Sequence, residues 1–371
     1  MKNKYLFWLL LGIGMVQTSC EPHGNNVANT EYARLFNGIC DTMENHYVFF
    51  DQMNSDWDSI RPYYQAKINN ISEEKEFVSQ MNSFLATIGD PYINISYNRQ
   101  YMANDFPIAK DCSYAPDPKR DETAECIKSH SNGATHSYYT LMKKEEVVTD
   151  SIFYDFMAIK VASTSQAAPV LVQQLKEISE NSTADGLIID LRSSIKSYRD
   201  INILVAAHIT QSLLHKDEEH ILCEYKRSES DTITSIFPVT QVKLIGLGYC
   251  VDKPIVVLVN ENVLGVKHIL ASMLSELPNV CIIGRHSTTG YGCVAKEYSV
   301  GSKHHKNYAN NKMLLPSYRY TYNEVDISEN ILNPDILVDW DVEQESSTSA
   351  IYSFDKCLYE AMKYIDSVRA K

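Results

Sequence analysis

Residues 254–271 read PIVVLVNENVLGVKHILA, and this stretch decides the fold. Residues 254–260 are almost entirely apolar and are bounded by proline and asparagine, which is typical of a strand buried on both faces. A short turn follows, and a helix is predicted to begin at Gly265. A buried strand that runs directly into a helix is the unit of a sheet covered by helices, so the stretch predicts an α/β fold.

The rest of residues 151–371 continues this pattern. Further strands are predicted at 153–161, 186–191 (GLIIDL), 221–225, 242–247 and 280–283. Helices are predicted at 167–181 and 201–214, and a last helix includes Ile351 and Met362. Near-continuous apolar strands that alternate with helices predict a β/α core over residues 151–371.

The N-terminal third is predicted to be a helical cap. Apolar and aromatic residues recur at helical spacing from residue 31 to about 85, and an alternating strand follows within 88–97. We therefore expect a cap and first strand over residues 31–100. Residues 101–150 are polar, with few apolar repeats, and are expected to form a variable segment.

The first residues have the pattern of an export signal. Lys2 and Lys4 precede an apolar run at 5–16, which is too short to span a bilayer, and small residues lead to Cys20. The pattern resembles a bacterial lipobox, although Gln17 departs from it. We expect a signal peptide at 1–19, a lipid anchor on Cys20, a tether at 20–30 and a place in the cell envelope, periplasmic or outer-surface. The alternative is a plain secretory signal.

Cysteines and charge limit the chemistry further. Disulfides are allowed in an exported protein, and Cys112 and Cys126 flank a polar loop that makes them the predicted pair. Cys223, Cys250 and Cys281 lie in or near apolar strands and are expected to be free and buried. The net charge of −13 disfavours nucleic acid as a partner. No C-x-x-C or H-E-x-x-H motif occurs, so neither a metal nor a cofactor is expected.

Several motifs, in order, resemble the tail-specific protease (C-terminal processing peptidase) family, which has a tricorn-like branch. They are ENHYVFFDQMNSDW at 44–57, LIIDLR at 187–192, the stretch 254–271, IGRHSTTGYG at 283–292 and ENILNPDILV at 329–338. The resemblance covers roughly residues 31–365. It implies a crotonase-like core and serine-peptidase activity on exported or unfolded polypeptides. The segment 101–150 is too short for the family's full PDZ domain.

The residues at the family's catalytic positions have changed. The nucleophilic serine is replaced by Gly265, which has no side chain with which to attack a carbonyl. The histidine base of the tricorn-like branch is replaced by Tyr92, and the lysine base of the other branch by Tyr291. Tyrosine ordinarily has a pKa of about 10 and is therefore a poor base near neutral pH.

The remaining positions follow the same trend. Ser194, Ile195 and Lys196 stand where the family has a glycine-rich oxyanion turn, and side chains there restrict the backbone. Glu329 matches the carboxylate that orients the tricorn-like site, or is a solvated loop acid. Ser272 is either a packing serine of the helix, which we favour, or a relocated nucleophile. His268 is expected to be a partly exposed helix residue.

The sequence therefore favours a catalytically silent relative that binds polypeptide or an envelope partner in the former cleft. One alternative is an active serine endopeptidase, which family membership alone would imply. Another is a structural lipoprotein whose cleft is filled by Tyr92, Tyr291 and Ile195.

Overall fold

The computed structural model describes most of the chain from residue 30 onward. The described residues are 30–53, 55–90, 92–97, 100–103, 126–131, 136–142, 153–160, 175–176, 179–180, 186–191, 203–228, 232–249, 251–260, 263–284, 293–301, 311–328, 331–338 and 356–369.

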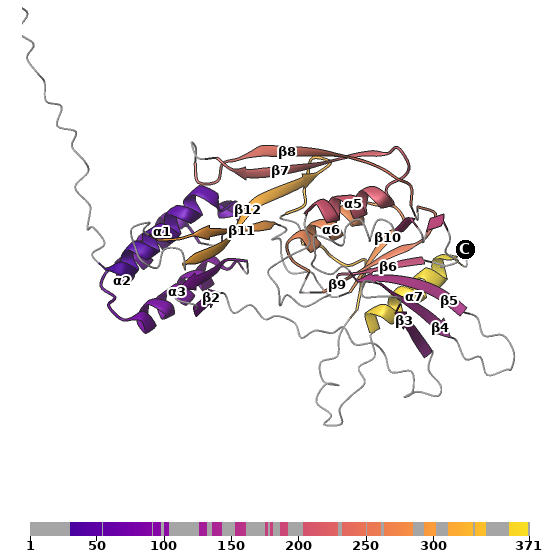
Figure 1. The fold of residues 1–371 in the computed structure, drawn as a ribbon, viewed down its shortest axis with the longest axis horizontal. Coiled ribbons are helices and arrows are strands. Elements are labelled where there is room, and N and C mark those ends of the chain that lie inside the picture. The colour runs from indigo at the N-terminus through magenta and orange to yellow at the C-terminus, as the bar shows by residue number, and fades with distance from the viewer. Residues whose placement is uncertain are drawn as a thin grey trace, which may run out of the picture.

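Three helices form the cap (Figure 1): α1 (Glu31–His46), α2 (Trp57–Ile68) and α3 (Glu74–Ile88), with a 3-10 turn, η1 (Phe50–Gln52), between the first two. The Oγ1 atom of Thr30 accepts a hydrogen bond from the main-chain N–H of Ala33 at 3.1 Å, which caps the start of α1. Gly89 ends α3 in the left-handed conformation, with a φ of 78°.

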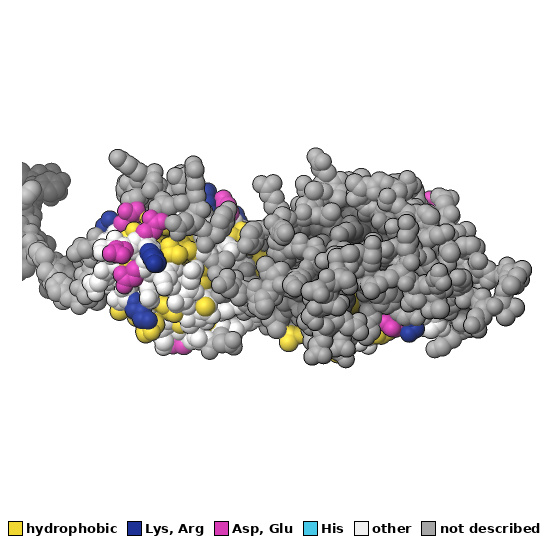
Figure 2. All heavy atoms as spheres, turned by 90° about the horizontal axis from the view of Figure 1, so that it is seen from below, with side chains coloured by type: hydrophobic (Ala, Val, Ile, Leu, Met, Phe, Trp, Pro, Cys, Tyr) yellow, Lys and Arg dark blue, Asp and Glu magenta, His cyan; other side chains and the backbone are white. Residues whose placement is uncertain are grey.

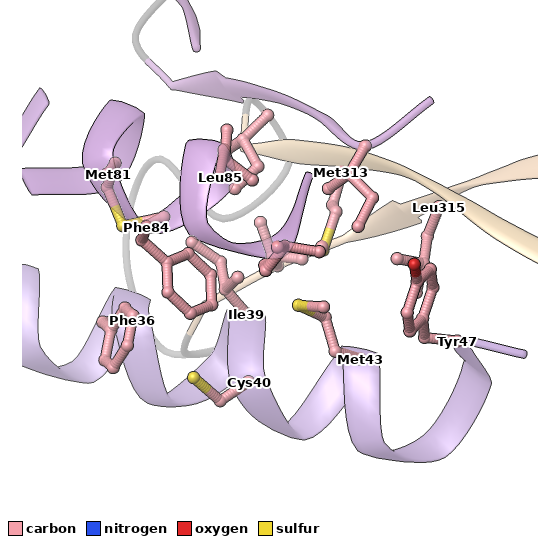
Figure 3. Close-up of a cluster of buried hydrophobic side chains, with 14 of the residues drawn as sticks. Phe36, Ile39, Cys40, Met43, Tyr47, Met81, Phe84, Leu85, Met313 and Leu315 are labelled. Carbon is pink, nitrogen blue, oxygen red and sulfur yellow. The ribbon is translucent and has the colours of Figure 1, made fainter. Parts of the chain in front are cut away.

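The core of the cap is aromatic and fully buried. Phe36 and Phe84 meet edge to face with ring centroids 5.1 Å apart. Met313 and Leu315 reach this cluster from strand β12 (Lys312–Tyr322), so the cap packs on a sheet and not on itself alone (Figure 3). On the face shown in Figure 2, acidic, basic and hydrophobic side chains are interspersed over the described surface of the cap.

The central sheet has the strand order β14-β10-β9-β6-β5-β4-β3. Its strands are β3 (Cys126–Ser131), β4 (His136–Met142), β5 (Phe153–Lys160), β6 (Gly186–Asp190), β9 (Ile255–Val259), β10 (Val280–Gly284) and β14 (Ile336–Leu337). The strands from β14 to β5 are parallel, whereas β4 and β3 add to one edge in antiparallel fashion.

Helices cover both faces of this sheet, as predicted. Along β9, Ile255, Val257 and Val259 join the cluster of α5 (Ile203–Leu213) and α6 (Val266–Ser275). The alternate residues Val256 and Leu258 join the cluster of α7 (Lys356–Arg369). Successive strand side chains point to opposite faces, so a strand with no polar residue must be covered twice. The α/β class is therefore confirmed.

A second sheet, with the order β2-β1-β12-β7-β8, joins the cap to the core. It contains β1 (Asn94–Tyr97), β2 (Gln100–Ala103), β7 (Glu219–Arg227) and β8 (Ile236–Ile245), while β11 (Val294–Ser299) and β13 (Val325–Asp326) pair with β12. The guanidinium of Arg319 on β12 bonds to Asp51 and Asp326 at 2.8 Å each. This ion pair ties the sheet to the segment after α1.

Most predicted elements are present, with two corrections. The strands predicted at 221–225 and 242–247 exist but belong to the second sheet, because they pair with each other and with β12 and not with the parallel strands. Residues 126–131 and 136–142, within the segment expected to be variable and polar, form β3 and β4 of the central sheet. Within the helix predicted at 167–181, the structure describes residues 175–176 and 179–180, and these residues are helical. None of the described helices is long and apolar enough to cross a membrane.

Candidate functional site

The junction between β9 and α6 is the position at which the sequence places the former nucleophile. The main-chain N–H of Val263 donates to the oxygen of Asn260 at 3.0 Å, which closes a tight turn after the strand. Gly265 then begins the helix, and its carbonyl accepts from the N–H of Ile269 at 3.1 Å. Residue 265 is therefore the N-cap of α6 and lies beyond the carboxyl end of the parallel strand β9.

Gly265 has a backbone conformation that other residues rarely adopt. Its φ is 60° and its ψ is −133°, which lies outside the small left-handed region that L-amino acids tolerate. In α/β-hydrolases, a sharp strand-to-helix turn carries the nucleophile on a strained residue. Here glycine relieves that strain and supplies no nucleophile.

Two hydrophobic clusters meet at this junction. Val263 and Val266 are buried in the cluster of α5 and α6, whereas Leu264 belongs to the cluster of the cap. Leu264 is 7% exposed. Leu264, which precedes Gly265, thus packs with the cap, whereas Val263 and Val266 pack with the core.

Tyr92 is in the same cluster as Leu264. It is 7% exposed, and its main-chain N–H donates to Oδ1 of Asp90 at 2.7 Å. The residue at the former base position is therefore packed into the cap side of the site. This burial is one part of the filled-cleft alternative; the other two residues of that alternative, Tyr291 and Ile195, lie outside the described residues.

Asp90 is a site residue that the sequence analysis missed. It is completely buried, and burial raises the pKa of its carboxyl to about 7, although hydrogen bonds from Tyr92 and Tyr47 act in the opposite direction. The sequence signal was weak, because an aspartate after a helix-ending glycine is ordinary in an exposed turn. Its burial depends on Tyr47, which is distant in the sequence.

The helix that follows Gly265 is buried along the whole stretch from Val266 to Leu274. His268 is 1% exposed, so the expectation of a partly exposed histidine was wrong. The physical reason is that α6 is packed between the central sheet and α5, which leaves no solvent face. Ser272 is 7% exposed and its carbonyl accepts from Ser275 Oγ at 2.8 Å, in agreement with a packing serine.

Several predicted site residues lie outside the described part of the chain. These are Tyr291, Glu329, the turn Ser194, Ile195 and Lys196, the lipidation residue Cys20, and Cys112 of the predicted disulfide. The partner of Cys112, Cys126, lies in β3, where only the backbone is described. The oxyanion turn, the lipid anchor and the disulfide therefore stay predictions.

The described thiols agree in part with the prediction. Cys281 is free and buried on β10, and burial raises its pKa to about 11. Cys223 is free but only partly buried, because it lies on the second sheet and not in the core. Cys250 is outside the described residues.

The protein is thus an α/β protein with a helical cap. Its candidate site is the junction at which β9 leads through Gly265 into the buried helix α6. The model of peptidase family S41 matches residues 155–338, and the model of the tricorn protease C1 domain matches residues 28–86. The chain therefore belongs to peptidase family S41, in agreement with the resemblance to tail-specific proteases.

Solved structures match the chain at low sequence identity. A protein from Parabacteroides merdae ATCC 43184 that is designated a peptidase is 15% identical, with a TM-score of 0.63 over 91% of this chain and 97% of that chain. Mature CPAF is 10% identical, with a TM-score of 0.54 over 91% and 96%. A lipoprotein from Streptococcus agalactiae is 13% identical, with a TM-score of 0.47 over 91% and 97%. No curated protein sequence matches the chain.

Proposed function

We propose that this chain is a member of peptidase family S41 that has lost hydrolysis and binds polypeptide or a protein of the cell envelope at the former active site. The observation that carries the proposal is Gly265, which is the N-cap residue of α6 and has no side chain. Binding requires only a surface that fits a polypeptide, whereas acyl transfer requires a nucleophile, a base and an oxyanion hole.

The expected loss of catalytic turnover is large enough to support this proposal. Removal of the nucleophile from a serine peptidase typically lowers turnover by a factor of about 10⁶. Tyr92, at the former base position, is packed in a hydrophobic cluster with Leu264, and its hydroxyl belongs to a residue type that is protonated near neutral pH. Both changes act in the same direction, so replacement of one residue would not restore hydrolysis.

We further propose that the protein is held at the envelope by a lipid on Cys20 and that no cofactor takes part. The lysines and apolar run before Cys20 support this location. An alkyne-tagged fatty acid supplied to bacteria that express the full chain should label it, and Cys20→Ser should abolish the label. A chain that stays unlabelled while it is exported would contradict the anchor and leave the plain secretory signal.

The test of the function is exposure of the purified mature protein to a mixture of unfolded peptides, read by mass spectrometry. We expect no cleavage above a buffer blank and retention of a subset of peptides on the protein. The control is Ser272→Ala, which removes the nearest hydroxyl on α6.

Cleavage that survives repeated purification would refute the proposal and leave the active endopeptidase. Loss of that cleavage in the Ser272 variant would identify a relocated nucleophile. Neither cleavage nor retention would favour the structural lipoprotein.

A further inference from the structure

The buried carboxyl of Asp90 joins two segments that are far apart in the sequence. Its Oδ2 atom accepts a hydrogen bond from the hydroxyl of Tyr47 at 2.9 Å. Its Oδ1 atom accepts from the main-chain N–H of Tyr92 at 2.7 Å. Tyr47 follows the last residue of α1, and Tyr92 precedes β1. One carboxyl therefore connects the end of the first helix to the turn of the former base position.

Tyr47 is also held by contacts that do not involve Asp90. The main-chain N–H of Tyr47 donates to the oxygen of Met43 at 2.8 Å, and its ring meets that of Phe50 edge to face at 5.1 Å. Figure 3 shows the ring of Tyr47 at the end of α1, beside Leu315. The Asp90 hydrogen bonds therefore link the Tyr92 turn to a residue that is anchored in the cap.

Other ionisable groups near this segment are engaged elsewhere. Among the described residues, the hydroxyl of Tyr47, which follows α1, and the N–H of Tyr92 both lower the pKa of Asp90. The charged side chains around the end of α1 have other contacts: Glu44 pairs with Arg61, Asp51 pairs with Arg319, and His46 stacks on Tyr298.

We propose that Asp90 is a proton-sensitive latch between the cap and the Tyr92 turn. The latch is firmest when the carboxyl carries its proton, and the turn opens more readily once the carboxyl is ionised. Because Tyr92 shares its cluster with Leu264, opening of the turn loosens the packing beside Gly265. The latch does not depend on whether the protein hydrolyses or binds peptides.

The direction of the pH dependence follows from the protonation states of Asp90 in the closed and open turn. When the Tyr92 turn is closed, the carboxyl of Asp90 is buried, and burial raises its pKa to about 7. In the open turn it reaches water and returns to an ordinary pKa of about 4, so opening releases a proton between these values. The closed form is therefore fully favoured below pH ~4, and this preference is lost as the pH rises to ~7. Above pH 7 it changes no further.

Hydrogen exchange measures this opening directly. The protection factor of the amides of residues 92–97, corrected for intrinsic exchange at each pH, should fall about 50-fold between pH 5 and pH 7 and level off above pH 7. In Asp90→Asn the amide keeps an acceptor for the Tyr92 N–H but cannot ionise, so protection should not change with pH. Tyr47→Phe removes a hydrogen-bond donor that lowers the pKa of Asp90. The pKa should therefore rise, and the pH at which the protection factor levels off should rise with it.

Tyr64→Phe is the matched control. It also removes a cap hydroxyl, one that contacts Ser83 O at 2.9 Å, and it should leave the pH profile unchanged. A flat profile in the natural protein, a profile that persists in Asp90→Asn, or a profile that Tyr47→Phe does not move would each overturn the latch. If Asp90→Asn fails to fold, the Tyr47 and Tyr64 variants still decide the question.

Discussion

Replacement of Gly265 by serine tests the junction that defines this protein. The substitution puts a serine where the sequence resemblance predicts the family's nucleophile, but it also puts a Cβ atom on a backbone with a φ of 60° and a ψ of −133°. That conformation is strained for any L-residue, and such strain costs about 1–3 kcal/mol. Gly265→Ser should therefore lower the stability of the protein without restoring hydrolysis, since the base position still holds a buried tyrosine.

The measurements are thermal unfolding and peptide cleavage. For domains of 150–250 residues, about 1–3 kcal/mol corresponds to a fall in Tm of about 2–12 °C. Cleavage is read by mass spectrometry on the same peptide mixture, and a fluorophosphonate probe reports whether the new hydroxyl is nucleophilic. We expect a lower Tm, no cleavage and no labelling.

Gly89→Ser is the matched control, because Gly89 has a φ of 78° and a ψ of 4° and a Cβ atom there would meet nothing within 4 Å. It should cost less than Gly265→Ser. An unchanged Tm for Gly265→Ser would refute the strained junction. Cleavage by that variant would show instead that the glycine alone silences the enzyme.

Three further predictions follow from the packing. Arg319→Met leaves two partly buried carboxylates without their guanidinium and should cost about 2–3 kcal/mol, measured by urea unfolding. Gly284→Ala should prevent normal folding, because a Cβ atom would lie 1.9 Å from the oxygen of Val259, and the soluble yield and circular dichroism report this. Cys281 should resist iodoacetamide in the folded protein at pH 8, whereas Cys223 reacts faster, because burial raises the pKa of Cys281 to about 11.

Controls separate these effects from general damage. Lys243→Met removes an exposed pair with Glu219 and should cost less than about 1 kcal/mol. A similar cost for both cation variants would contradict the assigned role of Arg319. Equal alkylation rates at Cys281 and Cys223 before unfolding would show that β10 opens readily, and a folded Gly284→Ala would show that β9 and β10 can separate.

The amino-acid sequence by itself determined most of the local elements, and it places a glycine where the family resemblance predicts the nucleophile. Residues 254–259 and 186–189 have no polar side chain to turn toward water, so burial on both faces of these strands is the physical consequence. The absence of a side chain at Gly265 is a property of the residue type. The family motifs lie in these same segments, and this is why the family could be predicted.

Only the tertiary structure decided which strands pair and which polar groups are buried. An alternating strand pattern does not say which sheet it joins, so β7 and β8 were assigned to the core although they pair with β12. His268 and Asp90 look exposed in the sequence because each stands in an ordinary helix or turn. Their burial comes from segments distant in the sequence that pack over them, and this is also what raises the pKa of Asp90.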